Sequence, residues 1–206
     1  NNTFFFFFYL ELRDRRYQIR KDNNINNSDI VFISVGKYQP KKRQFDILEA
    51  LNYLDAEEVR LLLVGDGELR SKYEEYIAKY NLQDKVYLTG FVNQSQISEY
   101  YMMADVMLLA SGIGETWGLV LNEAMNFNLP LIVSETPGAA IDLVQKNKNG
   151  FLYREGDVND LVEKMNELIN MKEIRLKFGK KSGSIITHYS YKAGISNILD
   201  YLNKGL

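Results

Sequence analysis

The sequence predicts an α/β fold built on a doubly wound parallel sheet. Short apolar runs alternate along the chain with longer amphipathic runs. The apolar runs are rich in Val, Ile and Leu and show no polar alternation, which is typical of strands buried on both faces of a parallel sheet. Glycine or serine ends most of these runs, so each strand is expected to turn directly into a helix.

Six apolar runs predict the strands, and the amphipathic runs between and after them predict the helices. The strands are expected at 30–36, 59–65, 85–90, 105–111, 129–134 and 150–155. The crossover helices are expected at 44–54, 67–81, 94–104, 117–127 and 138–147. Two closing helices are expected at 158–171 and 190–204.

The Asn-rich stretch "DNNINNSD" at 22–29 separates the first residues from this pattern. We therefore expect a domain at 30–206 and a separate segment at 1–29. The run "FFFFFYL" at 4–10 is too short to span a bilayer and lacks the features of a signal peptide. We expect it to form a strand or linker packed against another part of the protein.

The composition limits the classes of function. With 206 residues, 46% of them hydrophobic, the chain can build one substantial core. Its 25 basic and 27 acidic residues nearly cancel, so no general attraction for nucleic acid is expected. The absence of cysteine excludes disulfides and thiolate chemistry and is compatible with a reducing compartment. The single histidine, His188, lies far from every motif and receives no chemical role.

Ligands in such sheets bind beyond the carboxyl ends of the strands, so the strand-to-helix turns are the places to search. The first turn, "SVGKYQPKKRQ", gathers Lys37, Lys41, Lys42 and Arg43, which favours an anionic ligand such as phosphate. The alternative is a solvated basic loop.

The second and third turns offer backbone rather than charge. In "LLLVGDGELR", Gly65 and Gly67 permit close approach of the main chain, although glycines end strands in many proteins that bind no ligand there. In "LTGFVNQSQ", Phe91 and Val92 could present an apolar wall and main-chain groups to a flat base, or Phe91 could belong to the core.

The fourth turn, "GIGETWG", is the most informative. Its glycines allow a sharp bend that brings the free amides at the start of the next helix towards a ligand. Unpaired amides and the helix dipole bind anions there without a basic side chain. The amides concerned are those of Trp117, Gly118, Leu119 and Val120. Glu115 lies at the rim, where its carboxylate could accept hydrogen bonds from sugar hydroxyls.

Glu123 follows eight residues later, in an otherwise apolar helical run. Val120, Ala124 and Phe127 define the inward face of that helix, and Glu123 falls at the edge of the face. It is either a glutamate that reaches water from the edge or a carboxylate that binds the 2′ and 3′ hydroxyls of a ribose.

The motifs together resemble glycosyltransferase family 4, retaining enzymes of the two-domain GT-B architecture. Glu115 and Glu123 match the family's E-x7-E pattern, and "GETWGLVLNEAM" is similar to its "EGFGLVxxEAM". "FISVGKYQPKKRQFDILEAL", "LLLVGDGELR", "VYLTGFV", "ADVMLLAS" and "NGFLY" resemble the family's other segments, in the same order over about 30–171.

The resemblance implies roles for these residues. Lys37 and Lys42 would hold the donor diphosphate, with the amides of Gly118 and Leu119. From the turns themselves, the Trp117 amide and the close backbone at Gly67 are further candidates for substrate binding. Arg43 stands where the family has glycine and would join them or remain outside the site. Glu115 would bind the transferred sugar, Glu123 the ribose, and the main chain near Val92 the base. Asn128 replaces another glycine, at a helix end where asparagine is tolerated.

The resemblance covers only the C-terminal, Rossmann-like, donor-binding half of such an enzyme. We therefore expect residues 1–29 to be an interdomain segment, and the isolated chain to be inactive without its acceptor domain. The expected substrate is a nucleotide-diphosphate sugar, with no metal and no other cofactor. We expect a cytoplasmic protein, or one that contacts the membrane peripherally through the missing half. The alternative is a catalytically inactive nucleotide-sensing module; a nicotinamide-binding domain would need a GxGxxG motif that the first turn lacks.

Overall fold

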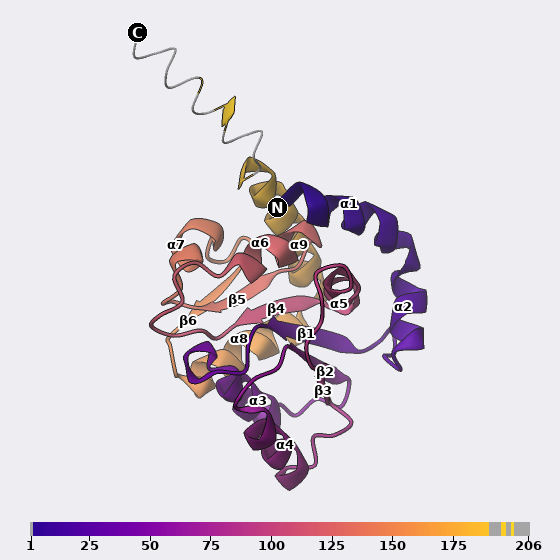
Figure 1. The fold of residues 1–206 in the computed structure, drawn as a ribbon, viewed down its shortest axis with the longest axis vertical. Helices are drawn as coiled ribbons and strands as arrows, with labels where there is room; N and C mark the ends of the chain where they lie inside the picture. The colour runs from indigo at the N-terminus through magenta and orange to yellow at the C-terminus, as the bar shows by residue number, and fades with distance from the viewer. Residues whose placement is uncertain (1, 190–194, 197–198, 200–206) are drawn as a thin grey trace.

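The computed structural model describes residues 2–189, 195, 196 and 199. A six-stranded parallel sheet forms the centre of the molecule, with strand order β3-β2-β1-β4-β5-β6 (Figure 1). The predicted fold class is confirmed. The strands are β1 (Ile30–Val35), β2 (Val59–Val64), β3 (Val86–Leu88), β4 (Val106–Leu109), β5 (Leu131–Ser134) and β6 (Gly150–Tyr153).

Both faces of the sheet are covered, as the unbroken apolar runs predict. Helices α3 (Gln44–Tyr53), α4 (Arg70–Lys79) and α8 (Val158–Asn170) cover one face. Helices α5 (Ile97–Met103), α6 (Leu119–Asn126) and α7 (Gly138–Leu143) cover the other (Figure 1). Each face of the sheet carries its own hydrophobic core, and alternate residues of β1 point into the two cores. Ile33 packs in one core and Phe32 in the other, and both are fully buried. Burial of each such side chain contributes about 1.5–3 kcal/mol.

The first residues form two helices, α1 (Asn2–Leu12) and α2 (Arg16–Asp22), joined by the short η1 (Arg13–Arg15). The prediction of a strand or linker at 4–10 is therefore wrong. Phe5 and Tyr9, one helical turn apart, both contact Phe127, and Phe5 also meets Tyr101 edge to face. These tertiary contacts select a helix although a run of phenylalanine has only a modest intrinsic preference for one.

Helix α2 belongs to the packed domain. Ile19 and Arg20 are buried, and Ile25 beyond the helix joins the same core. The structure thus begins to pack well before the predicted boundary at residue 30. Whether residues 1–29 also connect two domains stays a prediction.

Helix α9 (Lys172–Ile186) occupies a stretch for which the sequence predicted no helix. Its glycines obscured the pattern, because glycine disfavours helix interiors. The structure explains two of them: a Cβ on Gly179 or Gly183 would overlap the backbone or side-chain oxygen of Asn128. The 3-10 turn η3 (Thr187–Tyr189) follows. The helix predicted at 190–204 lies outside the described residues, apart from 195, 196 and 199.

Candidate functional site

The carboxyl edge of the sheet gathers the turns that follow β1, β2 and β3. The Gly65 amide donates to the Gly90 carbonyl oxygen at 3.1 Å, which joins two of these turns. A Cβ on Gly65 would overlap the carbonyl oxygen of Gly36, so only glycine allows β1 and β2 to end this close together. The glycines of the second turn therefore provide the close backbone approach that the sequence predicts.

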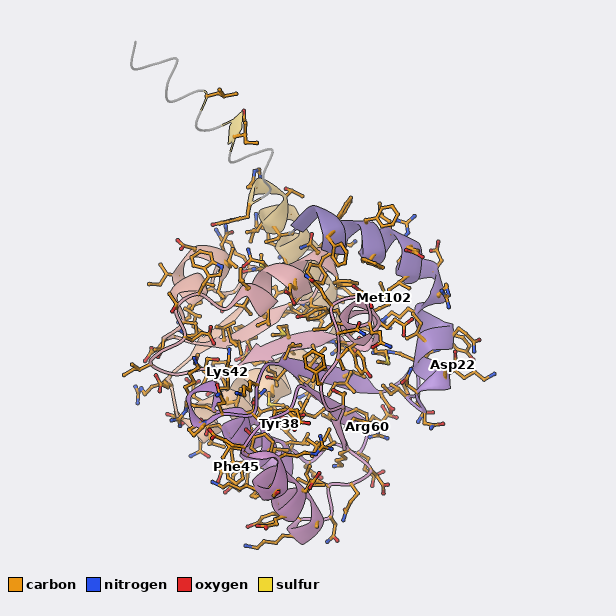
Figure 2. All side chains as sticks on the ribbon, viewed as in Figure 1. Asp22, Tyr38, Lys42, Phe45, Arg60 and Met102 are labelled. Atoms are coloured by element: carbon orange, nitrogen blue, oxygen red, sulfur yellow. The ribbon has the colours of Figure 1, made fainter. Side chains whose placement is uncertain are left out.

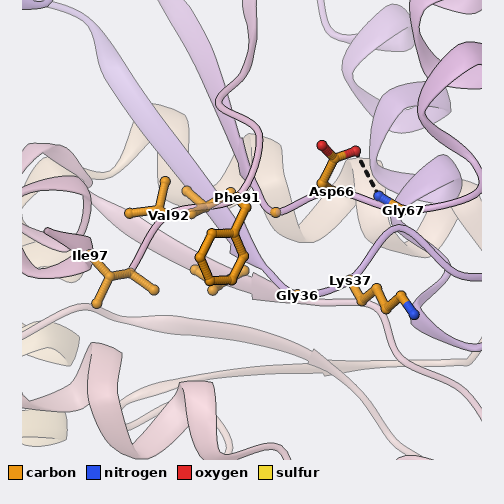
Figure 3. Close-up of a pocket in the computed structure, with 10 residues that line it drawn as sticks. Gly36, Lys37, Asp66, Gly67, Phe91, Val92 and Ile97 are labelled. Carbon is orange, nitrogen blue, oxygen red and sulfur yellow. Dashed lines mark hydrogen bonds between the residues drawn. The ribbon is translucent and has the colours of Figure 1, made fainter. Parts of the chain in front are cut away.

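A pocket of about 510 Å³ opens at this edge (Figure 3). It brings together Lys37, Gly67 and Val92, which the sequence placed in three different turns. Ile97, at the start of α5, closes one side. The pocket is lined by Val35, Gly36, Lys37, Val64, Gly65, Asp66, Gly67, Phe91, Val92 and Ile97.

The pocket has an apolar end and a charged end. Phe91 and Val92 lie at the apolar end near Ile97, and the Lys37 side chain extends away from Phe91 (Figure 3). Phe91 is 85% exposed, so it is not a core residue, and it offers a free aromatic face. The ammonium group of Lys37 makes no ion pair with any residue that the structure describes. Such a pocket suits a ligand with a flat ring at one end and negative charge at the other.

Lys42 and Glu115, which lie 73 residues apart, form an ion pair beside the pocket. Their side chains are only 17% and 14% exposed. The Lys42 side chain passes over Gly36, with its Cε 3.5 Å from where a Cβ on that glycine would lie. Figure 2 shows Lys42 at this edge of the sheet and Arg60 at the opposite edge. Because Gly36 also lines the pocket, the ion pair and the pocket are neighbours.

Two backbone hydrogen bonds hold the loop that carries Glu115. The Gly112 amide donates to the Lys41 carbonyl oxygen at 2.9 Å, and the Glu115 amide donates to the Gly112 carbonyl oxygen at 3.2 Å. The first of these joins the basic turn η2 (Pro40–Lys42) to the fourth turn. The basic first turn and the glycine-rich fourth turn are therefore neighbours.

Helix α6 begins beside this loop. Gly118 has φ of 99°, a left-handed conformation that favours glycine, and no side chain that the structure describes caps the helix. Within the described residues, no hydrogen bond occupies the amides of Gly118, Leu119 and Val120. A helix start with free amides attracts an anion. The predicted inward face is confirmed for Ala124 and Phe127, which are buried, but Val120 is only half-buried. Leu121 and Met125 are fully buried and complete the inward face.

The side chain of Trp117 is engaged elsewhere. Its ring N–H donates to Asn122 Oδ1 at 2.9 Å, and its carbonyl oxygen accepts from the Ala139 amide at 3.0 Å. The first bond fixes the ring against α6, and the second ties the start of α6 to α7. Only the amide of Trp117 remains a candidate for ligand contact, as the sequence predicts.

Glu123 is half-buried on α6 and accepts a hydrogen bond of 2.7 Å from the hydroxyl of Tyr101. Burial raises the pKa of Glu123, and the hydrogen bond from Tyr101 partly opposes that rise. Glu123 is not among the residues that line the pocket; its link to the pocket is Tyr101, which lies one helical turn after the lining residue Ile97. Tyr101 was not among the predicted site residues; its helical spacing from Ile97 was the available signal.

Arg43 turns towards carboxylates rather than towards the pocket. Its guanidinium contacts Asp46 at 2.8 Å and Glu155 at 3.9 Å. Neither carboxylate was predicted as a site residue: Asp46 lies in α3, three residues after Arg43, and Glu155 follows β6, remote from Arg43 in sequence. Burial raises the pKa of Asp46, although Arg43 opposes the rise.

Among the described residues, no group of three or more His, Cys, Asp or Glu side chains could hold a metal ion. In the same part of the chain, no helix is long and apolar enough to cross a membrane. The expectation that the chemistry uses no metal stays a prediction.

Comparison with known proteins gives consistent results. A family model described as "Glycosyl transferases group 1" matches residues 15–184. The N-acetyl-alpha-D-glucosaminyl L-malate synthase of Bacillus anthracis is 28% identical over 166 residues, which cover 80% of this chain and 42% of the synthase. The chain therefore spans less than half the length of this curated relative. The transferase names among its relatives do not favour the nucleotide-sensing alternative.

Solved structures share the fold. The HepE protein of Anabaena, in complex with UDP, superposes with a TM-score of 0.81 at 21% identity, covering 93% of this chain and 52% of that one. The C-terminal domain of a glycosyl transferase group 1 protein, LpcC of Francisella tularensis, superposes with a TM-score of 0.77 at 20% identity. That match covers 85% of this chain and 93% of the Francisella domain.

Proposed function

This chain belongs to the glycosyl transferases group 1 family, and from that premise we propose that it is the donor-binding domain of a retaining glycosyltransferase of family 4. The substrate is a nucleotide-diphosphate sugar, and the acceptor is a saccharide or a lipid-linked saccharide. The acceptor domain is supplied by another part of the protein. The protein works in the cytoplasm or at the inner face of the membrane.

One observation carries the proposal: a single edge of the sheet combines a pocket for a ring with cations and free amides for a diphosphate. Lys37 reaches the charged end of the pocket, and Lys42 lies over the neighbouring Gly36. The start of α6 adds unpaired amides beside Glu115. Lysine ammonium groups and helix starts both favour phosphate oxygens.

The apolar end of the pocket receives the base. Phe91 offers an exposed ring for stacking, and the main chain at Val92 offers hydrogen-bonding groups. Glu123, held by Tyr101, receives the ribose hydroxyls. A carboxylate suits this task because it accepts two hydrogen bonds at once.

The diphosphate is the leaving group. Lys37, Lys42 and the α6 amides stabilise the negative charge that grows on it as the bond to the sugar breaks. Glu115 accepts hydrogen bonds from the hydroxyls of the sugar and orients it. In the structure Lys42 is paired with Glu115. A diphosphate that attracts Lys42 therefore frees the Glu115 carboxylate for the sugar. The hydroxyl oxygen of the acceptor bonds to the sugar carbon on the face from which the diphosphate departs, and its proton passes to the departing diphosphate, so the configuration is retained.

Calorimetric titration with UDP, GDP and ADP tests the proposal. We expect one of these nucleotides to bind the chain, and Glu123→Ala to weaken its binding by roughly 10- to 100-fold, the value of hydrogen bonds to a charged group. Glu99→Ala is the matched control, because Glu99 is an exposed glutamate on α5. It should leave the affinity unchanged.

The 2′-deoxy form of the nucleotide that binds separates a ribose contact from general charge. Wild-type chain should bind the deoxy form more weakly, and Glu123→Ala should no longer distinguish the two forms. Equal affinities of the wild-type chain and Glu123→Ala for the ribonucleotide would end the ribose assignment. Failure of all three nucleotides to bind the wild-type chain would reject the donor site.

A further inference from the structure

Arg43 adopts a backbone conformation that glycine normally supplies. It joins η2 to α3 with φ of 48° and ψ of 26°, in the left-handed region. For a residue with a side chain this conformation has a steric cost that glycine avoids. The contacts of the side chain show what offsets this cost.

The Arg43 side chain bridges two carboxylates. Its Nε donates to Asp46 Oδ2 at 2.8 Å, and its terminal nitrogens lie 2.8 Å from Asp46 and 3.9 Å from Glu155. Glu155 also accepts a hydrogen bond of 2.5 Å from Thr136 Oγ1. The network therefore links the start of α3 with the segments that follow β5 and β6.

Gly112, in the loop that carries Glu115, lies in the middle of this network. A Cβ at Gly112 would overlap the Glu155 carboxylate and would lie 3.1 Å from Arg43 Cδ. The Gly112 amide is held by Lys41, and its carbonyl oxygen holds the Glu115 amide. The loop is thus enclosed by Arg43 and Glu155 on one side and by the basic turn on another.

We propose that Arg43 is a positioning residue that fixes the 112–115 loop, and with it Glu115, against the turn that bears Lys42. The effect on sugar binding rests on the proposed function: by fixing Glu115, Arg43 favours the binding of a nucleotide-sugar over the binding of the free nucleotide diphosphate. The control of the loop itself does not depend on that function.

Direct binding of phosphate by Arg43 fits the geometry less well. One guanidinium faces two carboxylates, Asp46 and Glu155, so this group of three has net negative charge. The neighbouring turn has three lysines, Lys37, Lys41 and Lys42, against one carboxylate, Glu115. A diphosphate is therefore attracted to the lysines and not to Arg43.

Hydrogen exchange in the ligand-free chain tests the structural half of the proposal. Arg43→Gly removes the side chain and keeps the backbone conformation accessible. We expect the exchange of the Gly112 and Glu115 amides to rise by roughly tenfold or more, as local opening becomes easier. Arg154→Ala is the control for the loss of an arginine, because Arg154 is 77% exposed and adjoins Glu155. Asn81→Gly controls for a left-handed residue away from the site.

Titration of the same variants with UDP and UDP-glucose, or with the matching pair for whichever nucleotide binds, tests the functional half. We expect Arg43→Gly to bind the free nucleotide within about twofold of wild type and the nucleotide-sugar roughly three- to tenfold more weakly. Glu155→Gln should have the same effect, and the double variant should add little, because both residues act in one network. Arg43→Lys, which keeps one ion pair, should restore part of the preference.

The outcomes are distinguishable. Unchanged exchange at Gly112 and Glu115 in Arg43→Gly would overturn the positioning role. Equal, salt-dependent weakening of both ligands would also overturn it and would make Arg43 a phosphate ligand. A lower melting temperature with an unchanged preference for the nucleotide-sugar would reduce Arg43 to a structural residue and would likewise overturn it. If no nucleotide binds the wild-type chain, the proposed function fails, and hydrogen exchange still decides whether Arg43 holds the loop.

Discussion

The two edges of the sheet both carry charged residues at strand ends, but they use them differently. At the amino edge, Asp105 accepts hydrogen bonds from Arg16 at 2.7 Å, from Arg20 at 2.6 Å and from the Val31 amide at 2.9 Å. Arg20 is only 1% exposed. At the carboxyl edge, Lys37 is exposed and Lys42 has Glu115 as its ionic partner.

The charged residues of the amino edge stabilise the fold, whereas those of the carboxyl edge are available to bind a ligand. Arg20 also donates to the carbonyl oxygens of Met103 and Asp29, so most of its donors are satisfied within the protein. Within the described residues, the lysines at the other edge retain free donors, and the start of α6 beside them keeps free amides as well. Loss of a charge should therefore reduce stability at one edge and ligand affinity at the other.

Replacement of Arg20 should have the largest effect. Arg20→Ala leaves the Asp105 carboxylate with Arg16 as its remaining ionic partner, and removal of one partner from a buried pair costs about 3–5 kcal/mol. Denaturant unfolding measures this loss. Lys37→Ala is the comparison at the other edge and should change stability by less than about 0.5 kcal/mol. Similar losses of unfolding free energy in Arg20→Ala and Lys37→Ala would contradict the distinction between the two edges.

The amino edge should also be sensitive to acid. Burial alone would raise the pKa of Asp105, but Arg20 and Arg16 lower it below its ordinary value. A carboxylate with a lowered native pKa contributes stability above its unfolded pKa, and this contribution is lost as pH falls through the native value. Asp105→Asn should therefore flatten the acid side of the stability profile. An unchanged profile would show that other groups control it.

Lys42 should dominate affinity at the carboxyl edge. Lys42→Ala should weaken nucleotide diphosphate binding by roughly 10- to 100-fold, because a hydrogen bond to a charged group contributes about 1.5–3 kcal/mol. Lys41→Ala is the matched control, since Lys41 is exposed in the same turn and contributes its backbone to the loop contact. Calorimetry at two salt concentrations measures the nucleotide affinity of both variants. Equal losses of affinity in Lys42→Ala and Lys41→Ala would indicate a diffuse basic patch instead of a specific contact by Lys42.

The pH dependence of nucleotide binding should show the protonation of Glu123. Its raised pKa means that the carboxylate gains a proton at a pH above the ordinary value of 4.5. Once protonated it loses an acceptor for the ribose, so affinity should fall as pH falls through this raised range. Glu123→Gln should bind weakly at every pH, with this step absent. A step that persists in Glu123→Gln would assign it to another group.

Tyr101 should give the smallest effect. Tyr101→Phe keeps the ring stacked on Phe127, at 5.4 Å between centroids, and removes only the hydrogen bond to Glu123. We expect a loss of about 0.5–1.5 kcal/mol in either stability or nucleotide binding. Unfolding and calorimetry on the same sample decide which. A loss confined to stability would place Tyr101 with the structural residues of the amino edge.

Much of the geometry of the candidate site could be predicted, because the topology of a parallel sheet decides where the turns after its strands lie. Once the strands are parallel, their carboxyl ends meet at one edge, so Lys37, Gly67 and Val92 must come close together although they lie in separate turns. The sequence could not show that Tyr101 reaches Glu123 or that Arg43 turns to Glu155. Those contacts depend on the side-chain directions of elements that are remote in sequence.

By itself the sequence determined the alternation of strands and helices, because periodicity and glycine-rich turns are local properties of the chain. The tertiary structure decided the helical state of the first residues, where Phe5 finds Tyr101 and Phe127. It also decided that α9 tolerates glycines, which let the helix approach Asn128, and that Lys42 pairs with Glu115. Packing and charge pairing depend on which residues lie close together in space. The order of residues along the chain does not show these distances, because they are set only when the chain folds.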